Sequence, residues 1–295
     1  MNLTVSKNIV IGLSLLIAFL AALAAATGLF SKENGASFTV STLHGQTAQI
    51  LGHGLYRYDT VFFGTGFRGQ DAVALFLGVP LLLIAVYLYQ RGSVGGHLLL
   101  TGILGYFLYA YASLALGAAY NRLFLLYIVL FSASLFAFIQ AFSSVNLGLI
   151  VSRLPDGLPR RGLSIFMFTG AVVTLIVWGA PLVSALLHGA PPDRMDSYTT
   201  MVTYALDLAI IPPASMLCAV LVWRGEPLGY VIASPLLVLI VLLAPTIVLT
   251  TIFQRAAGIP LTPGEMIGPV SGFVVLGLIA IWLLTAILRG VTRIT

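Results

Sequence analysis

Long apolar stretches separated by short polar segments run along the whole chain. Eight of them are about 20 residues or longer, the length a helix needs to cross the hydrocarbon core of a bilayer. They cover residues 8–30, 70–89, 97–119, 123–142, 163–187, 198–223, 228–253 and 267–288. The pattern predicts an all-α integral membrane protein, a polytopic bundle of about eight transmembrane helices. We expect residues 1–295 to form a single transmembrane domain.

The composition agrees with this prediction. Hydrophobic residues make up 59% of the chain and charged residues only 8%, whereas soluble domains carry about 25% charged residues. So few charges cannot cover a water-facing surface, and the lipid bilayer is the first expected partner. No run of three basic residues occurs, so we expect no nucleic-acid partner.

The first apolar stretch admits two interpretations. Lys7 precedes it and small residues at 22–26 suit a signal peptidase, so a signal peptide is one of them. Its apolar run is longer than the 7–15 residues usual in signal peptides, and we therefore favour a retained helix. Both interpretations leave residue 31 on the outer side.

Lysine and arginine are distributed unevenly between the two sides of the predicted bundle. With the N-terminus inside, eight basic residues lie inside: Lys7, Arg91, Arg153, Arg160, Arg161, Arg224, Arg289 and Arg293. The short outer loops hold three, which are Arg122, Arg194 and Arg255. Because basic residues favour the cytoplasmic side, we expect a multi-pass protein of a cell membrane, of the bacterial inner-membrane type, with both termini cytoplasmic.

The longest predicted loop, residues 31–69, lies on the outer side. Residues 37–43 are rich in β-forming side chains and alternate in part, and residues 46–51 can pair with them across His44 and Gly45. We therefore expect a small external loop or β-hairpin cap on the bundle. The segment from Tyr56 to Asp59 is typical of chain lying among lipid headgroups.

Asp207 is the sharpest single candidate for a functional residue. It lies about ten residues into the stretch 198–223, where a carboxylate costs roughly 2.5–3.5 kcal/mol to insert. Pro212 and Pro213 follow and predict a break or kink near 208–212. An acid beside a broken helix is how many transporters build a binding site. The alternatives are a later helix start, with Asp207 at the interface, or a structural hydrogen bond.

Three of the four histidines fall on the predicted outer side. His44, His53 and His188 lie in outer segments that also carry Asp59 and Asp196. Imidazole and carboxylate groups together suit Zn²⁺ or a similar ion. Their spacing matches no ligand signature, so they are weak candidates for a metal site or for an outer-face catalytic site. The sequence identifies no cofactor.

Four charges surround the predicted outer mouth of the second span. They are Arg57, Asp59, Arg68 and Asp71. We favour local ion pairs and an acid at the start of a helix over substrate capture.

The third span carries several tyrosines, of which Tyr106 and Tyr109 share a helical face. With Ser132, Ser134 and Gln140 of the fourth span they can line a cavity. Interhelical packing and hydrogen bonding are the more common roles of such residues.

Three classes of function remain open. The first is a secondary transporter or permease of a small solute or ion that uses Asp207. The second is a non-catalytic membrane scaffold or sensor that binds a membrane or external protein partner through the loop 31–69. The third is a membrane-embedded enzyme with an outer-face histidine and aspartate site. No phosphate-binding loop, HExxH or GxSxG motif is present, so an enzyme is the less favoured class.

Overall fold

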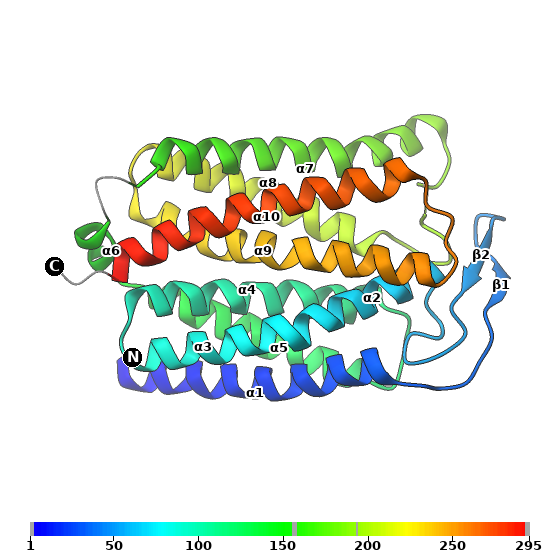
Figure 1. The fold of residues 1–295 in the computed structure, drawn as a ribbon, viewed down its shortest axis with the longest axis horizontal. Helices are drawn as coiled ribbons and strands as arrows, with labels where there is room; N and C mark the ends of the chain where they lie inside the picture. The colour runs from blue at the N-terminus through cyan, green and yellow to red at the C-terminus, as the bar shows by residue number, and fades with distance from the viewer. Residues whose placement is uncertain (1–2, 155–157, 193, 293–295) are drawn as a thin grey trace.

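The computed structural model describes residues 3–154, 158–192 and 194–292, and these residues contain eight helices long and apolar enough to cross a membrane. The long helical elements are α1 (Leu3–Phe30), α2 (Val61–Val73), α3 (Val79–Gln90), α4 (Val94–Gly117), α5 (Phe124–Ser143), α7 (Arg160–His188), α8 (Val202–Trp223), α9 (Pro227–Ala256) and α10 (Pro263–Thr292). A π-helical turn, η1 (Ala74–Gly78), joins α2 to α3, and α6 (Leu147–Arg153) is short. By length and composition this is a multi-pass helical membrane bundle (Figure 1).

Helix α4 forms the centre of the bundle and α7 lies at its edge. In the apolar window of α4, 83% of the residues are buried, against 11% for α7. Two small residues bring α9 close to α4: a Cβ on Gly102 would lie 3.0 Å from the Ser234 hydroxyl. Ser234 donates a hydrogen bond of 2.6 Å to the carbonyl oxygen of Leu98. Small residues allow such close helix approach where lipid provides no hydrophobic driving force.

The second span begins at Val61, nine residues before the expected start at Gln70. Glycines at 64, 66 and 69 favour a loop when local propensity alone is considered. The Thr60 side chain accepts a hydrogen bond from the backbone N–H of Phe63 and caps the helix. Gly66 and Gly69 then face Thr250 of α9, which donates to the carbonyl oxygen of Gly66, whereas Gly64 faces Leu51 and Tyr56 of the preceding loop. The outer loop therefore ends at Thr60.

The predicted hairpin is confirmed. Strands β1 (Phe38–Ser41) and β2 (Thr47–Ile50) pair antiparallel, with Phe38 opposite Ile50 and Ser41 opposite Thr47. Gly45 in the turn has a φ of 75°, a conformation that suits glycine. The hairpin lies at the end of the bundle opposite to both chain termini (Figure 1).

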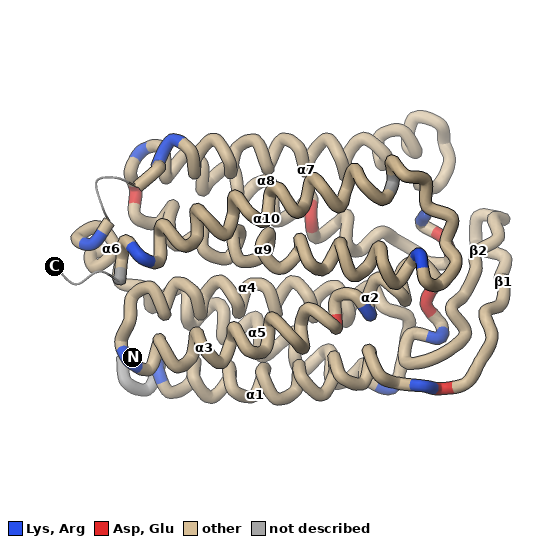
Figure 2. Tube along the Cα trace, in the orientation of Figure 1, with Lys and Arg blue, Asp and Glu red and all other residues tan. Residues whose placement is uncertain are grey.

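Helix α1 is an integral part of the bundle in this structure. Ile17, Ala21 and Ala25 are fully buried, and the helix contacts α2, α3 and α5. Charged positions gather at the two ends of the bundle, and few lie along the helices between them (Figure 2).

Candidate functional site

Three aspartates at or inside the hairpin end of the bundle each accept a hydrogen bond from a tyrosine. Asp59 pairs with Tyr198, Asp71 with Tyr56, and Asp207 with Tyr109, each at 2.7 Å between the oxygens. The two ion pairs found among the described residues both involve Glu33, so none of these aspartates has an ion-pair partner there. Carboxylates removed from water without a cation are costly, and such groups mark functional sites in membrane proteins.

The pair formed by Asp207 and Tyr109 joins α8 to α4. Asp207 is half-buried and is the sixth residue of α8, because this helix begins at Val202, four residues later than predicted. At 1.5 Å per residue, Asp207 lies about 8 Å from the start of its helix. The carboxylate is therefore closer to the hairpin end of the bundle than the sequence indicated.

The predicted helix break near Pro212 and Pro213 is not present, because α8 continues as one helix through both prolines. Neither proline has an N–H to donate to the carbonyl oxygens of Leu208 and Ala209. Membrane helices tolerate such prolines where neighbouring helices support them, and α8 packs against α4, α7 and α9. The effect next to Asp207 is two carbonyl groups without a helical donor.

A small pocket lies at the hairpin end of the bundle, between the ends of α4 and α8. Its volume is about 20 Å³, enough for one water molecule. Tyr198 and Gly117 line it, together with Ser113 and Thr203. Ser113 lies one turn after Tyr109 on α4, and Thr203 lies one turn before Asp207 on α8. The pocket thus ends about one helical turn from this aspartate–tyrosine pair, on the side of the hairpin.

Asp71 is a second carboxylate inside a predicted span, and the sequence analysis expected it at a helix start. The early start of α2 makes Asp71 the eleventh residue of its helix, so the expected role at a helix start is wrong. Tyr127 donates to the hydroxyl of Tyr56 at 3.4 Å, which extends the network around the carboxylate. A Cβ on Gly28 would overlap the Asp71 carboxylate. The close approach of α1 therefore encloses this group.

Tyr106 and Tyr109 do not line one cavity. Tyr109 donates to Asp207 on α8, whereas Tyr106 packs against Gly78 of the η1 turn and its buried hydroxyl has no hydrogen-bond partner among the described residues. Ser134 is buried and Ser132 is exposed on α5, and no α5 residue lines the pocket near Asp207. Of these two tyrosines of α4, only Tyr109 therefore hydrogen-bonds a carboxylate.

Asp59 connects three segments at the hairpin end. Its Oδ1 atom accepts hydrogen bonds of 2.7 Å from the Tyr198 hydroxyl and from the backbone N–H of Ala119. Its Oδ2 atom is buried and has no hydrogen-bond partner. Burial raises the pKa of Asp59 to about 7, although the two hydrogen bonds act in the opposite direction. The outer loop, the α4–α5 connection and the α7–α8 connection are therefore held together by a carboxyl group that titrates near neutral pH.

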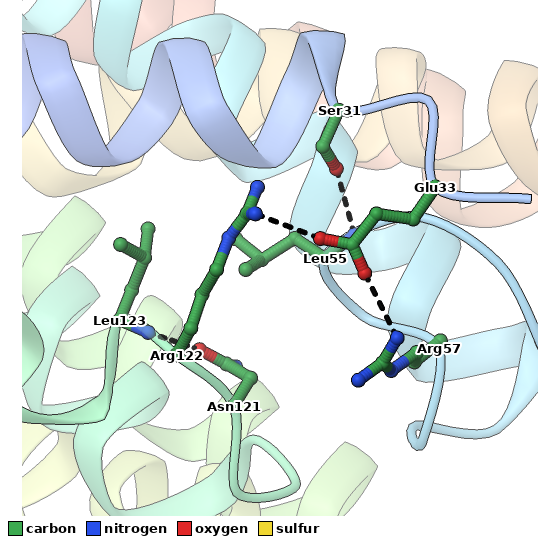
Figure 3. A network of polar contacts seen from close by, with 7 residues as sticks. All are labelled: Ser31, Glu33, Leu55, Arg57, Asn121, Arg122 and Leu123. Carbon is green, nitrogen blue, oxygen red and sulfur yellow. Dashed lines mark hydrogen bonds and ion pairs between the residues drawn. The ribbon is translucent and has the colours of Figure 1, made fainter.

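Arg57 does not pair with Asp59. Glu33 accepts from Arg57 at 3.0 Å and from Arg122 at 2.8 Å, which ties the outer loop to the α4–α5 connection (Figure 3). Nearby, Leu55 donates its backbone N–H to the Ser31 hydroxyl at 2.7 Å. The arginines are about half exposed, so each pair contributes about 0–1 kcal/mol. This cluster holds segments together at the hairpin end of the bundle, and Arg57 is not a partner of Asp59.

The histidine candidates do not come together. His44 is exposed in the hairpin turn. His53 is half-buried in the loop that follows the hairpin. The Nδ1 atom of His188 forms a hydrogen bond of 2.7 Å with the carbonyl oxygen of Ser184 in its own helix. Among the described residues, no three His, Cys, Asp or Glu side chains are placed to hold a metal ion.

Replacing Tyr56 by phenylalanine should destabilise the protein by about 1–3 kcal/mol. The change removes the hydroxyl donor of the buried Asp71 carboxylate and leaves that carboxylate unsatisfied. Tyr58→Phe is the matched control, because Tyr58 is 54% exposed and should change stability by less than about 0.5 kcal/mol. Thermal unfolding in detergent measures both variants. Equal melting temperatures would argue against a structural role for the Tyr56 hydroxyl.

Comparison with known proteins adds no further information on this site: no family model, curated protein sequence or solved structure matches the chain.

Proposed function

We propose that the protein is a secondary transporter or channel-like permease of a small solute or ion, with Asp207 as the binding carboxylate. The observation that carries this proposal is the position of Asp207 inside α8, hydrogen-bonded to Tyr109 and one helical turn from Thr203, which lines a pocket at the hairpin end. We place both termini on the cytoplasmic side of a cell membrane of the bacterial inner-membrane type, because the predicted inner segments hold the larger share of basic residues.

The surroundings of Asp207 suit a cation or a polar solute. The carbonyl oxygens of Leu208 and Ala209 have no proline N–H to pair with, and carbonyl groups near an acid are the ligands transporters use for ions. Tyr109 can donate to a bound solute or to the empty carboxylate. The pocket in its present form holds about one water molecule, so uptake of a larger solute requires α8 to move relative to α4.

Ligand-dependent stability of the purified protein tests this function. We would measure melting temperature in detergent with sodium, potassium, calcium, inorganic phosphate, single amino acids and simple sugars, at pH 5 to 8. A ligand present at 100 times its dissociation constant adds about 2.7 kcal/mol to stability. We expect at least one of these probes to stabilise the wild type. The same probe should then be taken up by proteoliposomes.

Asp207→Asn should remove the response to that probe and its uptake, while the variant still folds. Glu226→Gln is the matched control, because Glu226 is an exposed acid at the opposite end of α8. Uptake that is unchanged in Asp207→Asn would contradict the role assigned to this carboxylate. A wild type that responds to no probe at any pH would contradict the transport function itself.

A membrane scaffold or sensor is the second candidate. The hairpin carries Leu43 with 83% of its surface exposed and Phe38 with 45% exposed, and apolar side chains at an exposed tip mark protein contact sites. Leu43→Asp should then abolish capture of a protein partner without affecting the response of the Asp207 site. Partner binding by that variant equal to wild type would contradict this second candidate.

A further inference from the structure

A groove lies between α7 and α8 at the end of the bundle that carries the chain termini. Its volume is about 450 Å³. Apolar side chains line most of it, among them Ile165 and Phe168 of α7 and Val220 and Trp223 of α8. The Ser164 hydroxyl donates to the carbonyl oxygen of Ala219 at 2.7 Å, which fixes the first turns of α7 level with the last turns of α8. The groove thus lies between two helices that are packed and hydrogen-bonded to each other.

Three arginines belong to the helix ends that border this groove. Arg224 lines it directly, and Arg160 and Arg161 begin α7. The Nη1 atom of Arg160 lies 3.3 Å from the position that a Cβ on Gly225 would occupy, so the guanidinium group is beside the chain that follows Arg224. The ion pairs found among the described residues involve none of these arginines. Two acids lie near in sequence: Glu226, two residues after Arg224, and Asp156, four residues before Arg160 and outside the described residues. The three arginines outnumber them, so the formal charge of these segments is positive.

The start of α7 lacks the negative charge that a helix start favours. Its first turn contains no acid, and the preceding Pro159 provides no side-chain cap. The first N–H groups of a helix and its dipole present positive charge. Arg160 and Arg161 add like charge at that point, which is unfavourable unless an anion is near. Charge at the end of the groove is therefore complementary to an anionic headgroup.

We propose that this groove binds an anionic glycerophospholipid. Its phosphate would contact Arg160, Arg161 and Arg224, and one acyl chain would lie along Ile165, Phe168 and Val220. Basic pockets between helices on the cytoplasmic side bind anionic lipid headgroups, and Trp223 has the amphipathic ring typical of the interface. Few residues of α7 are buried against the rest of the protein, so a lipid at this seam adds contacts to the α7–α8 pair. This inference is independent of the transport function.

The test compares lipids that differ only in headgroup. Protein in a neutral detergent would be titrated with phosphatidylglycerol, with phosphatidylcholine of the same chains, and with inorganic phosphate. Bound lipid would be counted by native mass spectrometry, and stability followed by thermal unfolding. We expect phosphatidylglycerol to bind and to raise the melting temperature, and phosphatidylcholine and inorganic phosphate to have much weaker effects.

Variants separate the headgroup contacts from the groove. Arg160→Gln combined with Arg224→Gln should weaken phosphatidylglycerol binding about 30-fold, given about 1 kcal/mol for each basic residue near a lipid headgroup. Arg91→Gln is the control, because Arg91 is exposed on a segment that does not line the groove. Val220→Trp should also weaken binding, because Val220 lines the groove and the larger ring fills it while the arginines remain.

Three results would overturn the proposal. Equal binding of phosphatidylglycerol and phosphatidylcholine would show that the arginines do not select the headgroup. Equal stabilisation by inorganic phosphate would show an anion site without a lipid. Wild-type affinity in both the double arginine variant and Val220→Trp would place the lipid elsewhere on the bundle.

Discussion

Replacing Gly69 by alanine should destabilise the protein by about 3 kcal/mol or more. A Cβ at this position would lie 2.7 Å from the backbone nitrogen and 2.9 Å from the Cα of Thr250. Because the obstacle is backbone, α2 and α9 must separate, and overpacking of this kind costs about 1–3 kcal/mol or more. Separation would also stretch the hydrogen bond from Thr250 to the carbonyl oxygen of Gly66. Unfolding by heat or by sodium dodecyl sulfate in mixed micelles measures the effect.

Gly66→Ala is the matched control for this prediction. It lies on the same helix, and its Cβ would be 3.6 Å from the Cγ2 atom of Thr250, an ordinary contact. Alanine has a higher helix propensity than glycine by up to about 1 kcal/mol, so this variant should be neutral or slightly stabilised. Similar losses of stability in both variants would contradict the prediction, because they would show that Gly69 is not needed for the close approach of the α2 and α9 backbones.

Stability should fall by about 4 kcal/mol between pH 4 and pH 7 because of Asp59. Its pKa rises from the ordinary value of 3.8 to about 7 in the folded protein, owing to burial. Between these values the folded state holds a proton that the unfolded state has lost, so unfolding releases a proton. Stability therefore decreases by about 1.4 kcal/mol for each pH unit in this window. The contribution of this group levels off about one pH unit below 4 and about one pH unit above 7.

The comparison with Asp59→Asn isolates this effect from other titrating groups. Asparagine stays neutral, and its side-chain oxygen can still accept from Tyr198 and from the backbone N–H of Ala119. The difference between wild-type and variant unfolding free energies should change by about 4 kcal/mol from pH 4 to pH 7. Two parallel curves would mean that Asp59 is not the titrating group.

The predicted spans show which structural features can be predicted from the sequence of such a chain. Continuous apolar stretches predicted eight helices, and the described residues contain eight of the required length and composition. Alternation around His44 and Gly45 predicted the hairpin, because both strands and their turn are adjacent in sequence. The start of the second span was placed nine residues too late, since Gly64, Gly66 and Gly69 are typical of a loop, and only the tertiary structure shows Gly66 and Gly69 packed beside α9.

That error concealed Asp71. Counted from Gln70, Asp71 is a residue at a helix start, and counted from Val61 it lies three turns inside the bundle. Thr60 was the available sequence signal, because a threonine before an apolar run is a good helix cap. Asp59 was likewise counted as a surface charge, and its burial depends on Ala119 and Tyr198, which lie 60 and 139 residues further along the chain.

The sequence by itself determined the helical membrane class, the approximate spans, the hairpin and Asp207 as a candidate residue. These follow from local composition and spacing, because the bilayer requires every spanning segment to be apolar and to satisfy its own backbone. Tertiary structure alone decided which tyrosine serves which aspartate, and it brought Arg160 beside the chain that follows Arg224. Lipid tails solvate all apolar helix faces about equally well. Which helices pack together therefore depends on close packing of small residues and on polar contacts between helices distant in sequence.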